Sequence, residues 1–228
     1  MKKLTKRLSL AKKKLLKDSY DITSAVKIGK SLATAKFSES MEAHICLNLD
    51  PKQANQQFRT TVVLPKGTGK KITIAVLAPS GKHDEALSAG ADIVGDDDLI
   101  SEISKGVINF DILVTVPEMI PRLTTLGKIL GPRKLMPSAK AGTVTTDLSR
   151  TIDSFKMGQI ECRVDKAGII HVLFGKSNFT EADLLENLLV IFNAVKQNKP
   201  LGVKNKYINN FYICSTMGPS IQINLNNL

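Results

Sequence analysis

The segment from Leu126 to Thr146, LGKILGPRKLMPSAKAGTVTT, limits the folds open to this chain more than any other segment. Its three glycines and two prolines exclude a regular helix or a central strand, because proline donates no backbone hydrogen bond and glycine costs conformational entropy. The segment has no acidic residue, and apolar residues are interleaved with its basic ones. Disordered segments lack such apolar residues. We therefore expect an ordered basic loop with turns at Gly131-Pro132 and Met136-Pro137.

The chain on both sides of this loop alternates short apolar runs with helical segments, which indicates βαβ units and a parallel sheet. Strands are predicted at residues 72–77, 92–94 and 111–116, and helices at residues 82–89, 97–105 and 148–157. This part of the chain, residues 68–159, is therefore predicted to be an inserted, Rossmann-like α/β domain.

The two ends of the chain follow a different pattern. Residues 40–49 alternate between apolar and polar side chains, which is typical of a half-buried strand. Further strands are predicted at residues 59–64, 160–165, 169–174, 207–215 and 221–225, and helices at residues 3–17, 22–35 and from Thr180 onward. Lys166-Ala167-Gly168 is predicted to be the three-residue loop of a hairpin. Residues 1–67 and 160–228 together therefore predict one discontinuous α+β domain with an antiparallel-rich sheet.

Charge divides the chain in the same way. The net charge is +11, yet residues 68–159 hold equal numbers of basic and acidic residues, so the whole surplus lies in the two ends. A basic surplus on one unit is typical of a protein that binds a polyanion, and a solubilising surface charge explains it equally well. No run of 18 apolar residues is present, which excludes a membrane-spanning helix, and we expect no membrane partner.

Motifs of catalytic or metal sites are absent from the sequence. Gly67-Thr68-Gly69-Lys70 resembles part of a phosphate-binding loop, but Lys71 stands where serine or threonine is required. The histidines and cysteines lack metal-ligand spacing, and the cysteines fit buried side chains in a reducing compartment. These residues are His44, His83, His171, Cys46, Cys162 and Cys214. We predict no catalytic residue, cofactor or metal, and the alternative kept open is a nucleotide-binding enzyme using the inserted domain.

Groups suited to RNA are found in the turns of the two ends. Lys166 is expected at an exposed hairpin tip, and Lys176 in an exposed turn. The turn from Ser215 to Ser220 offers hydroxyl groups and an apical methionine beside a glycine, which suit 2′-hydroxyl and phosphate contacts. Phe37 follows Lys36 at a predicted helix-to-strand junction, where the pattern alone favours a core side chain.

The run G-P-R-K-L-M-P, followed by K-A-G-T-V-T, resembles the signature of the L-one family of large-subunit ribosomal proteins, which build the mobile stalk. The resemblance extends from Lys36 to Ile221. The signature normally has glycine where this chain has Lys134, and lysine resists a positive φ at that position.

The resemblance implies that the domain made from both chain ends binds folded large-subunit ribosomal RNA. It also implies contacts with deacylated tRNA at the exit site and, as in some bacterial members, repression of translation through the protein's own messenger RNA. Asn210 stands where the family usually has serine, and an amide can still donate and accept. The resulting RNA-binding candidates are Lys36, Phe37, Asp165, Lys166, Lys176, Asn210, Ser215, Thr216, Met217 and Gly218.

The composition and two segments bear on the source. The chain is rich in lysine, isoleucine and asparagine, and the segments D-L-L-E-N-L and Y-I-C-S-T-M-G-P-S-I are most similar to cyanobacterial and algal plastid versions. This similarity implies a ribosomal protein of the plastid (chloroplast) stroma, with the bacterial cytoplasm as the alternative.

Overall fold

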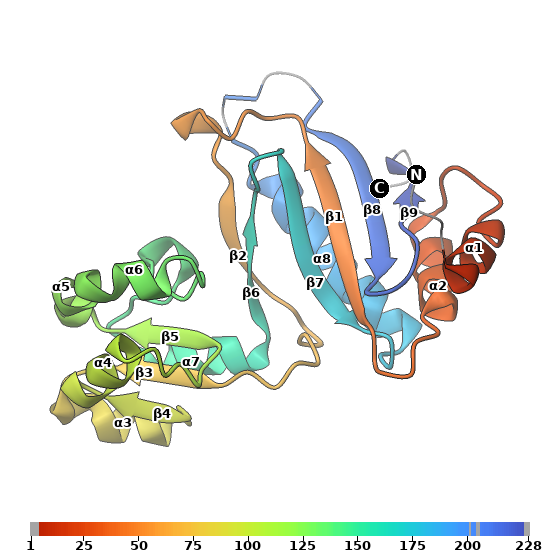
Figure 1. Cartoon of the computed structure of the whole chain (residues 1–228). Helices are drawn as coiled ribbons and strands as arrows, with labels where there is room; N and C mark the ends of the chain where they lie inside the picture. Colours follow the sequence, from red (N-terminus) through yellow and green to blue (C-terminus); the bar gives the residue numbers. More distant parts are fainter. Residues whose placement is uncertain (1–4, 201, 204–205, 226–228) are drawn as a thin grey trace. The chain divides into compact units, whose positions relative to one another are not determined.

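The computed structural model describes residues 5–200, 202–203 and 206–225 (Figure 1). The chain divides into two compact units, of which unit 1 consists of Met1–Gly69 and Ile160–Leu228 and unit 2 of Lys70–Gln159. Unit 1 therefore contains both ends of the chain and the entire charge surplus. Among the described residues, no helix is both long enough and apolar enough to cross a membrane.

The centre of unit 1 is a four-stranded sheet in which every neighbouring pair is antiparallel (Figure 1). Its strands, in the order β7-β1-β8-β9, are Ile169–Lys176, Ser40–Leu47, Ile208–Ser215 and Ile221–Ile223. Buried and half-buried residues alternate along the whole of β1, as its sequence pattern predicts. In the register of the central pairs, Ala43 lies opposite both Val172 and Ile213. One face of the sheet therefore carries the apolar side chains.

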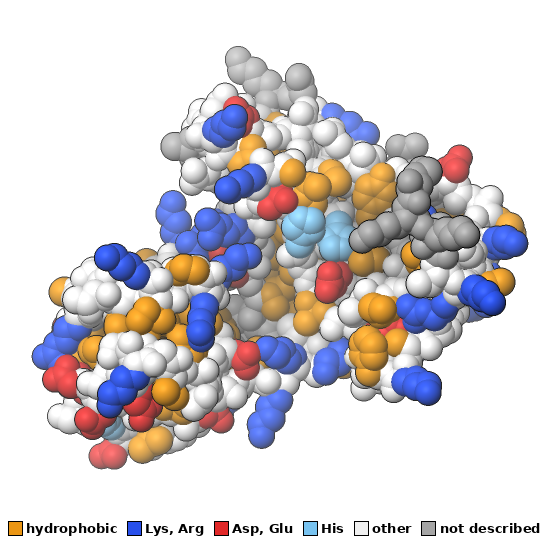
Figure 2. All heavy atoms as spheres, in the orientation of Figure 1, with side chains coloured by type: hydrophobic (Ala, Val, Ile, Leu, Met, Phe, Trp, Pro, Cys, Tyr) orange, Lys and Arg blue, Asp and Glu red, His pale blue; other side chains and the backbone are white. Residues whose placement is uncertain are grey.

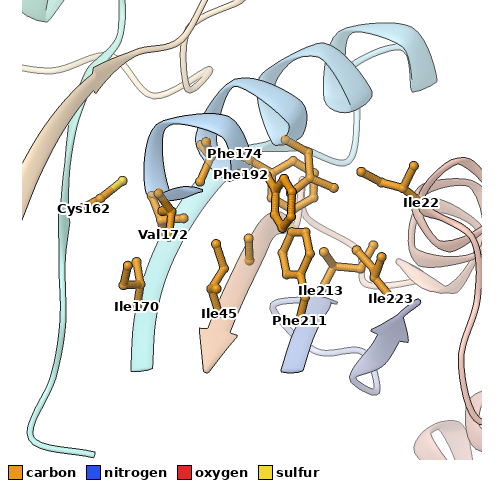
Figure 3. Packing of buried hydrophobic residues seen from close by; sticks show 14 of the residues in the cluster. Ile22, Ile45, Cys162, Ile170, Val172, Phe174, Phe192, Phe211, Ile213 and Ile223 are labelled. Carbon is orange, nitrogen blue, oxygen red and sulfur yellow. The ribbon is translucent and has the colours of Figure 1, made fainter. Parts of the chain in front are cut away.

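Helices cover this apolar face. The helices of unit 1 are α1 (Lys6–Lys13), α2 (Ile22–Leu32) and α8 (Glu181–Gln197), and α2 and α8 contact each other as well as the sheet. Figure 3 shows Phe192 of α8 above Phe211 of β8, and their rings stack with centroids 5.6 Å apart. The Thr180 side chain caps α8 by accepting from the Asp183 amide, at the residue where the helix is predicted to begin. Leu189 of α8 is exposed, so not every leucine of this helix faces the core.

The two strands on either side of Lys166 do not pair with each other as the predicted hairpin requires. Strand β6 (Gln159–Arg163) pairs with β2 (Arg59–Val63) in a separate two-stranded sheet, whereas β7 pairs with β1. Among the described residues, Val164 and Ile170 form the bridge that joins the two segments. Gly168 at the turn has φ 80°, as the tight turn requires. The apolar pattern identified both strands, but a pattern does not specify which neighbour a strand pairs with.

Unit 2 contains a parallel sheet of three strands, as the sequence predicts. Its order is β4-β3-β5, with β4 Ile93–Gly95, β3 Ile74–Leu77 and β5 Ile112–Thr115. Its helices are α3 (His83–Ser88), α4 (Asp97–Ser104), α5 (Ile120–Leu123), α6 (Gly127–Leu130) and α7 (Leu148–Met157). Every residue of β3 is buried, and its alternate side chains enter two separate apolar clusters. Both faces of this sheet are therefore covered.

The basic loop, residues 126–146, is ordered, but it contains short helical turns although the sequence pattern excluded a regular helix. Its first residues form the single helical turn α6, and Ala139–Ala141 form a 3-10 turn. Lys134 has φ 60°, which makes it the sole non-glycine residue with positive φ in the described part of the chain. The lysine thus adopts the left-handed conformation that it was expected to resist, because the turn closed by the Lys134 amide and the Gly131 carbonyl dictates the backbone there.

Candidate nucleic-acid interface

The second face of the unit 1 sheet carries polar and half-buried side chains. In Figure 2, histidine and hydrophobic side chains lie together on the molecular surface. The residues of this open face include Glu42, His44 and Cys46 on β1, His171 and Leu173 on β7, and Asn210, Tyr212 and Cys214 on β8. An antiparallel sheet with one packed face and one accessible face gives RNA a surface for stacking and hydrogen bonding.

At the Ser40 end of β1, the buried Glu39 side chain joins two surface segments. Its carboxylate accepts hydrogen bonds from the Ala35 amide at 2.8 Å and from the Met217 amide at 3.0 Å. The guanidinium of Arg7 on α1 donates to the Met217 carbonyl at 2.7 Å. We call this arrangement, residues 35–40 together with residues 215–218, the Glu39 junction. It fixes two segments that lie far apart in the sequence.

Glu39 is ionised at neutral pH. Burial raises the pKa of its carboxyl, but the hydrogen bonds from the Ala35 and Met217 amides, together with the Ser215 side chain and the charge of Arg7, hold the pKa below its usual value. Sequence reasoning missed this residue. A usable signal was present, because Glu39 continues the odd-numbered, core-facing series of Met41, Ala43 and Ile45 by one step.

The last residue of β8, Ser215, and the turn after it carry four of the predicted RNA-binding residues. Met217 is 53 % exposed, whereas Ser215 is buried. Thr216 Oγ1 accepts from the Ser40 amide at 2.9 Å and lies 3.3 Å from the Ser40 carbonyl, so this hydroxyl already has partners within the protein. A Cβ at Gly218 would contact Ser215 Oγ, so a larger residue there requires this buried hydroxyl to move. The structure therefore gives Thr216 a structural role and leaves Met217 accessible.

Phe37 is a surface residue and not a core residue. Its ring is 55 % exposed, so the interpretation favoured by the sequence pattern alone is wrong. Lys36 beside it is exposed. Phe37 lies in a bend between α2 and β1, and the buried side chain of this connection is Glu39, whose carboxylate accepts from the Ala35 amide. An exposed aromatic ring beside a lysine is suited to stacking on a base and contacting a phosphate.

Lys176 lies at the same end of the sheet, directly opposite Ser40 in the strand register. Its predicted position in an exposed turn is wrong, because β7 continues through Lys176 and the lysine is half-buried. Gly175 beside it is buried, and a Cβ there would lie 2.6 Å from Leu184. The sheet thus brings Lys176 to the Glu39 junction.

The remaining candidates lie toward the Leu47 end of β1. Asp165 accepts from the Ala167 amide at 2.9 Å and from the Ile169 amide at 2.8 Å, and these bonds, that from Ile169 foremost, lower the pKa of its carboxyl. Lys166 at the turn is exposed. Asn210 lies opposite Cys46 in the register and accepts from the Gln222 amide group at 3.4 Å. The candidates therefore form two groups, one at each end of β1, roughly 20–25 Å apart for an eight-residue strand.

Between these two groups lies a cluster of titratable side chains on the open face. Nδ1 of His44 lies 2.8 Å from Nδ1 of His171, and Nε2 of His44 lies 3.1 Å from Sγ of Cys214. Burial, followed by the neighbouring His171, lowers the pKa of His44. Burial and the charge of Glu42 raise the pKa of the Cys214 thiol. Within the described residues, Glu42, His44 and Cys214 form the group of side chains that can hold a metal ion.

Comparison with known proteins identifies the family of this chain. Residues 29–219 match the Ribosomal protein L1p/L10e family. The chain belongs to this family. Family members are structural ribosomal proteins, so a nucleotide-binding enzyme is not supported. The match covers β1 to β8 and the Glu39 junction, which places all ten predicted RNA-binding residues within the family region.

Three relatives show how closely the family matches this chain. It is 53 % identical over 225 residues to large ribosomal subunit protein uL1c of Guillardia theta, covering 99 % of this chain and 96 % of the relative. It is 52 % identical to uL1c of Pyropia yezoensis, with both chains covered completely. It is 51 % identical to uL1 of Prochlorococcus marinus (strain NATL1A), covering 100 % of this chain and 97 % of the relative. Plastid-type and cyanobacterial proteins are therefore similarly related to it.

Proposed function

We propose that this protein is a structural constituent of the large ribosomal subunit that binds ribosomal RNA through the open face and the Glu39 junction of unit 1. The observation that carries the proposal is the junction itself, where a buried carboxylate holds two exposed side chains, Phe37 and Met217, on segments joined to the same strand end. The relatives are named as large ribosomal subunit proteins.

The surface chemistry of unit 1 supports RNA as the ligand. The whole surplus of +11 lies in this unit, and phosphate contacts from lysine and arginine supply the sequence-independent part of the affinity. Exposed aromatic and methionine side chains supply stacking and apolar contacts with bases. The candidates at the Leu47 end, Asp165, Lys166 and Asn210, extend the contact along the strand and fit a folded RNA segment of several nucleotides.

Finer roles follow from the same family assignment. We propose that the protein stands at the mobile stalk near the tRNA exit site and assists release of deacylated tRNA. We also propose that the RNA-binding surface can bind a similar fold in the protein's own messenger RNA and repress its translation. The plastid stroma is the proposed location, since plastid-type relatives match at 52–53 % identity.

A titration of the intact protein against large-subunit ribosomal RNA tests the main proposal. Met217→Ala and Phe37→Ala are expected to weaken binding by about 5–150-fold, because each lost stacking or apolar contact costs about 1–3 kcal/mol. Met157→Ala is the matched control, since Met157 is 66 % exposed but belongs to unit 2. Equal affinities for wild type, Met217→Ala and Met157→Ala would show that the junction is not the RNA-binding surface.

A further inference from the structure

Three side chains with different metal-binding atoms converge on the open face of unit 1. His44 Nε2 lies 3.1 Å from Cys214 Sγ and 3.9 Å from Glu42 Oε2, and the three ligand atoms lie within 4.8 Å of one another. We propose that Glu42, His44 and Cys214 form a binding site for a divalent transition metal ion of the Zn²⁺ type. The proposal does not depend on RNA binding.

The strand register builds this site. Glu42 and His44 are two residues apart on β1 and therefore point to the same face of the sheet. Cys214 lies directly opposite Glu42 on the neighbouring strand β8. Side chains paired across antiparallel strands in this way have Cβ atoms about 4.5–5.5 Å apart, which is close enough for a shared ion.

Hydrogen bonds behind His44 direct the lone pair of its ring toward the proposed site. Asp165 Oδ2 lies 3.4 Å from His171 Nε2, so in the neutral ring this nitrogen carries the proton and donates it. His171 Nδ1 then accepts from Nδ1–H of His44 at 2.8 Å. The lone pair of His44 is consequently on Nε2, the atom that faces Cys214 and Glu42. A second hydrogen-bonded group that orients a ligand histidine is a common feature of metal sites.

The ligand types and their spacing select the ion. Thiolate and imidazole favour Zn²⁺ and similar ions, whereas Mg²⁺ and Ca²⁺ require oxygen ligands. Bond lengths of about 2.0–2.3 Å in a tetrahedral site place neighbouring ligand atoms roughly 3.3–3.7 Å apart. The observed 3.1 and 3.9 Å fall on either side of this range, so small side-chain rotations suffice.

The site is open to solvent on one side. Side-chain exposure is 43 % for Glu42 and 24 % for His44, so an ion can enter, and the fourth coordination position is left for water. Binding forms a bond between Cys214 Sγ and the metal, and the thiol proton is released to solvent. The sequence pattern gave His44 and Cys214 no shared role, and this site would give them one.

Titration of the intact protein with Co²⁺, in the absence of RNA, tests the proposal. Wild type is expected to bind one ion and to show a thiolate-to-cobalt charge-transfer absorption, which Zn²⁺ then removes by displacement. Cys214→Ser is expected to abolish this absorption. Cys46→Ser is the matched control, since Cys46 is a half-buried cysteine on the same face of β1 that is not part of the site, and it should retain the absorption.

Further variants separate the site from adventitious binding. His44→Gln and Glu42→Gln should weaken Co²⁺ binding at least tenfold, and His171→Phe about 10–100-fold through loss of the orienting hydrogen bond. His83→Gln in unit 2 should leave the affinity unchanged. The proposal is overturned if wild type shows no charge-transfer absorption, or if the absorption persists in Cys214→Ser.

A measurement on the wild-type chain covers the case in which Cys214→Ser does not fold. One equivalent of Zn²⁺ should slow alkylation of Cys214 relative to Cys46, as read by peptide mass spectrometry. Equal rates of alkylation with and without Zn²⁺ would overturn the proposal. Because none of these measurements contains RNA, their outcome is independent of the titration with ribosomal RNA.

Discussion

The two units of this protein use their sheets in opposite ways. The parallel sheet of unit 2 is buried on both faces, with two apolar clusters around a strand whose every residue is buried. The antiparallel sheet of unit 1 packs one face against α2 and α8 and leaves the other accessible. A sheet covered on both faces contributes stability, whereas a sheet with an open face can also present side chains to a ligand. The difference explains why the charge surplus and the candidate contacts belong to unit 1.

The sharpest test of this comparison replaces one strand leucine in each unit with alanine and compares the loss of stability. Leu113 of β5 is 1 % exposed, and Leu113→Ala is expected to destabilise the protein by about 2–5 kcal/mol through lost burial and a cavity. Leu173 lies on the open face of β7, and Leu173→Ala should cost less than about 1 kcal/mol. Urea unfolding of both variants measures this. Equal losses would show that the open face is packed as tightly as the covered ones.

A similar contrast exists between two glutamates on the two faces of the unit 1 sheet. Glu39→Ala is expected to cost on the order of 3 kcal/mol, because two backbone amides lose a buried acceptor. Glu42→Ala, on the open face, should change the free energy of unfolding by less than about 0.5 kcal/mol. Glu39→Ala should also reduce RNA affinity, since it releases the segments that hold Phe37 and Met217. A destabilised variant with unchanged RNA affinity would show that the Glu39 junction stabilises the fold but does not contribute to RNA binding.

Acid should weaken the Glu39 junction. The pKa of Glu39 is lower in the folded than in the unfolded protein, so its carboxylate stabilises the fold fully above the unfolded value. This contribution is lost as the pH falls below the usual glutamate pKa of about 4.3 and through the lower folded value. Glu39→Gln should flatten this part of the stability curve in urea unfolding between neutral and acidic pH. An unchanged slope would contradict the pKa assignment.

The two units can also be compared by removing three positive charges from each and measuring the salt dependence of RNA binding. A triple change of Lys12, Lys13 and Lys14 to alanine, on or next to α1, should reduce the salt dependence of RNA binding by up to about 0.7–0.9 per lost phosphate contact. The same loss of three charges from the basic loop, at Arg133, Lys134 and Lys140, should leave the salt dependence unchanged. The reverse result would show that the basic loop of unit 2 makes the phosphate contacts.

The smallest expected effect concerns strain within that loop. Lys134→Gly should stabilise the protein by about 1 kcal/mol, because a non-glycine residue pays roughly 1–2 kcal/mol for the left-handed conformation. Lys128→Gly is the control of opposite sign, since Lys128 lies in helix α6, where glycine costs about 1 kcal/mol. Thermal unfolding of both variants checks the pair. A destabilised Lys134→Gly would mean that the turn does not strain the lysine.

The sequence alone predicted a parallel α/β sheet and an antiparallel-rich sheet, and it located most of their strands and the longer helices. Period-two alternation located β1, apolar runs located the strands of unit 2, and local capping located α8, because these signals depend on neighbours along the chain. The family signature in the basic loop identified the protein class, although the loop lies outside the unit that carries the charge surplus.

The tertiary structure determined the features that local sequence signals do not encode. Strand pairing assigned β6 to β2 and brought Cys214 opposite Glu42, and no local pattern reports a neighbour so far away in the chain. Between α2 and β1 the structure buries Glu39, whose carboxylate accepts from backbone amides, and leaves the apolar Phe37 exposed. The backbone of one turn forced Lys134 into a conformation that its own preference opposes. In each case a long-range contact or a fixed backbone outweighed a local preference of about 1 kcal/mol.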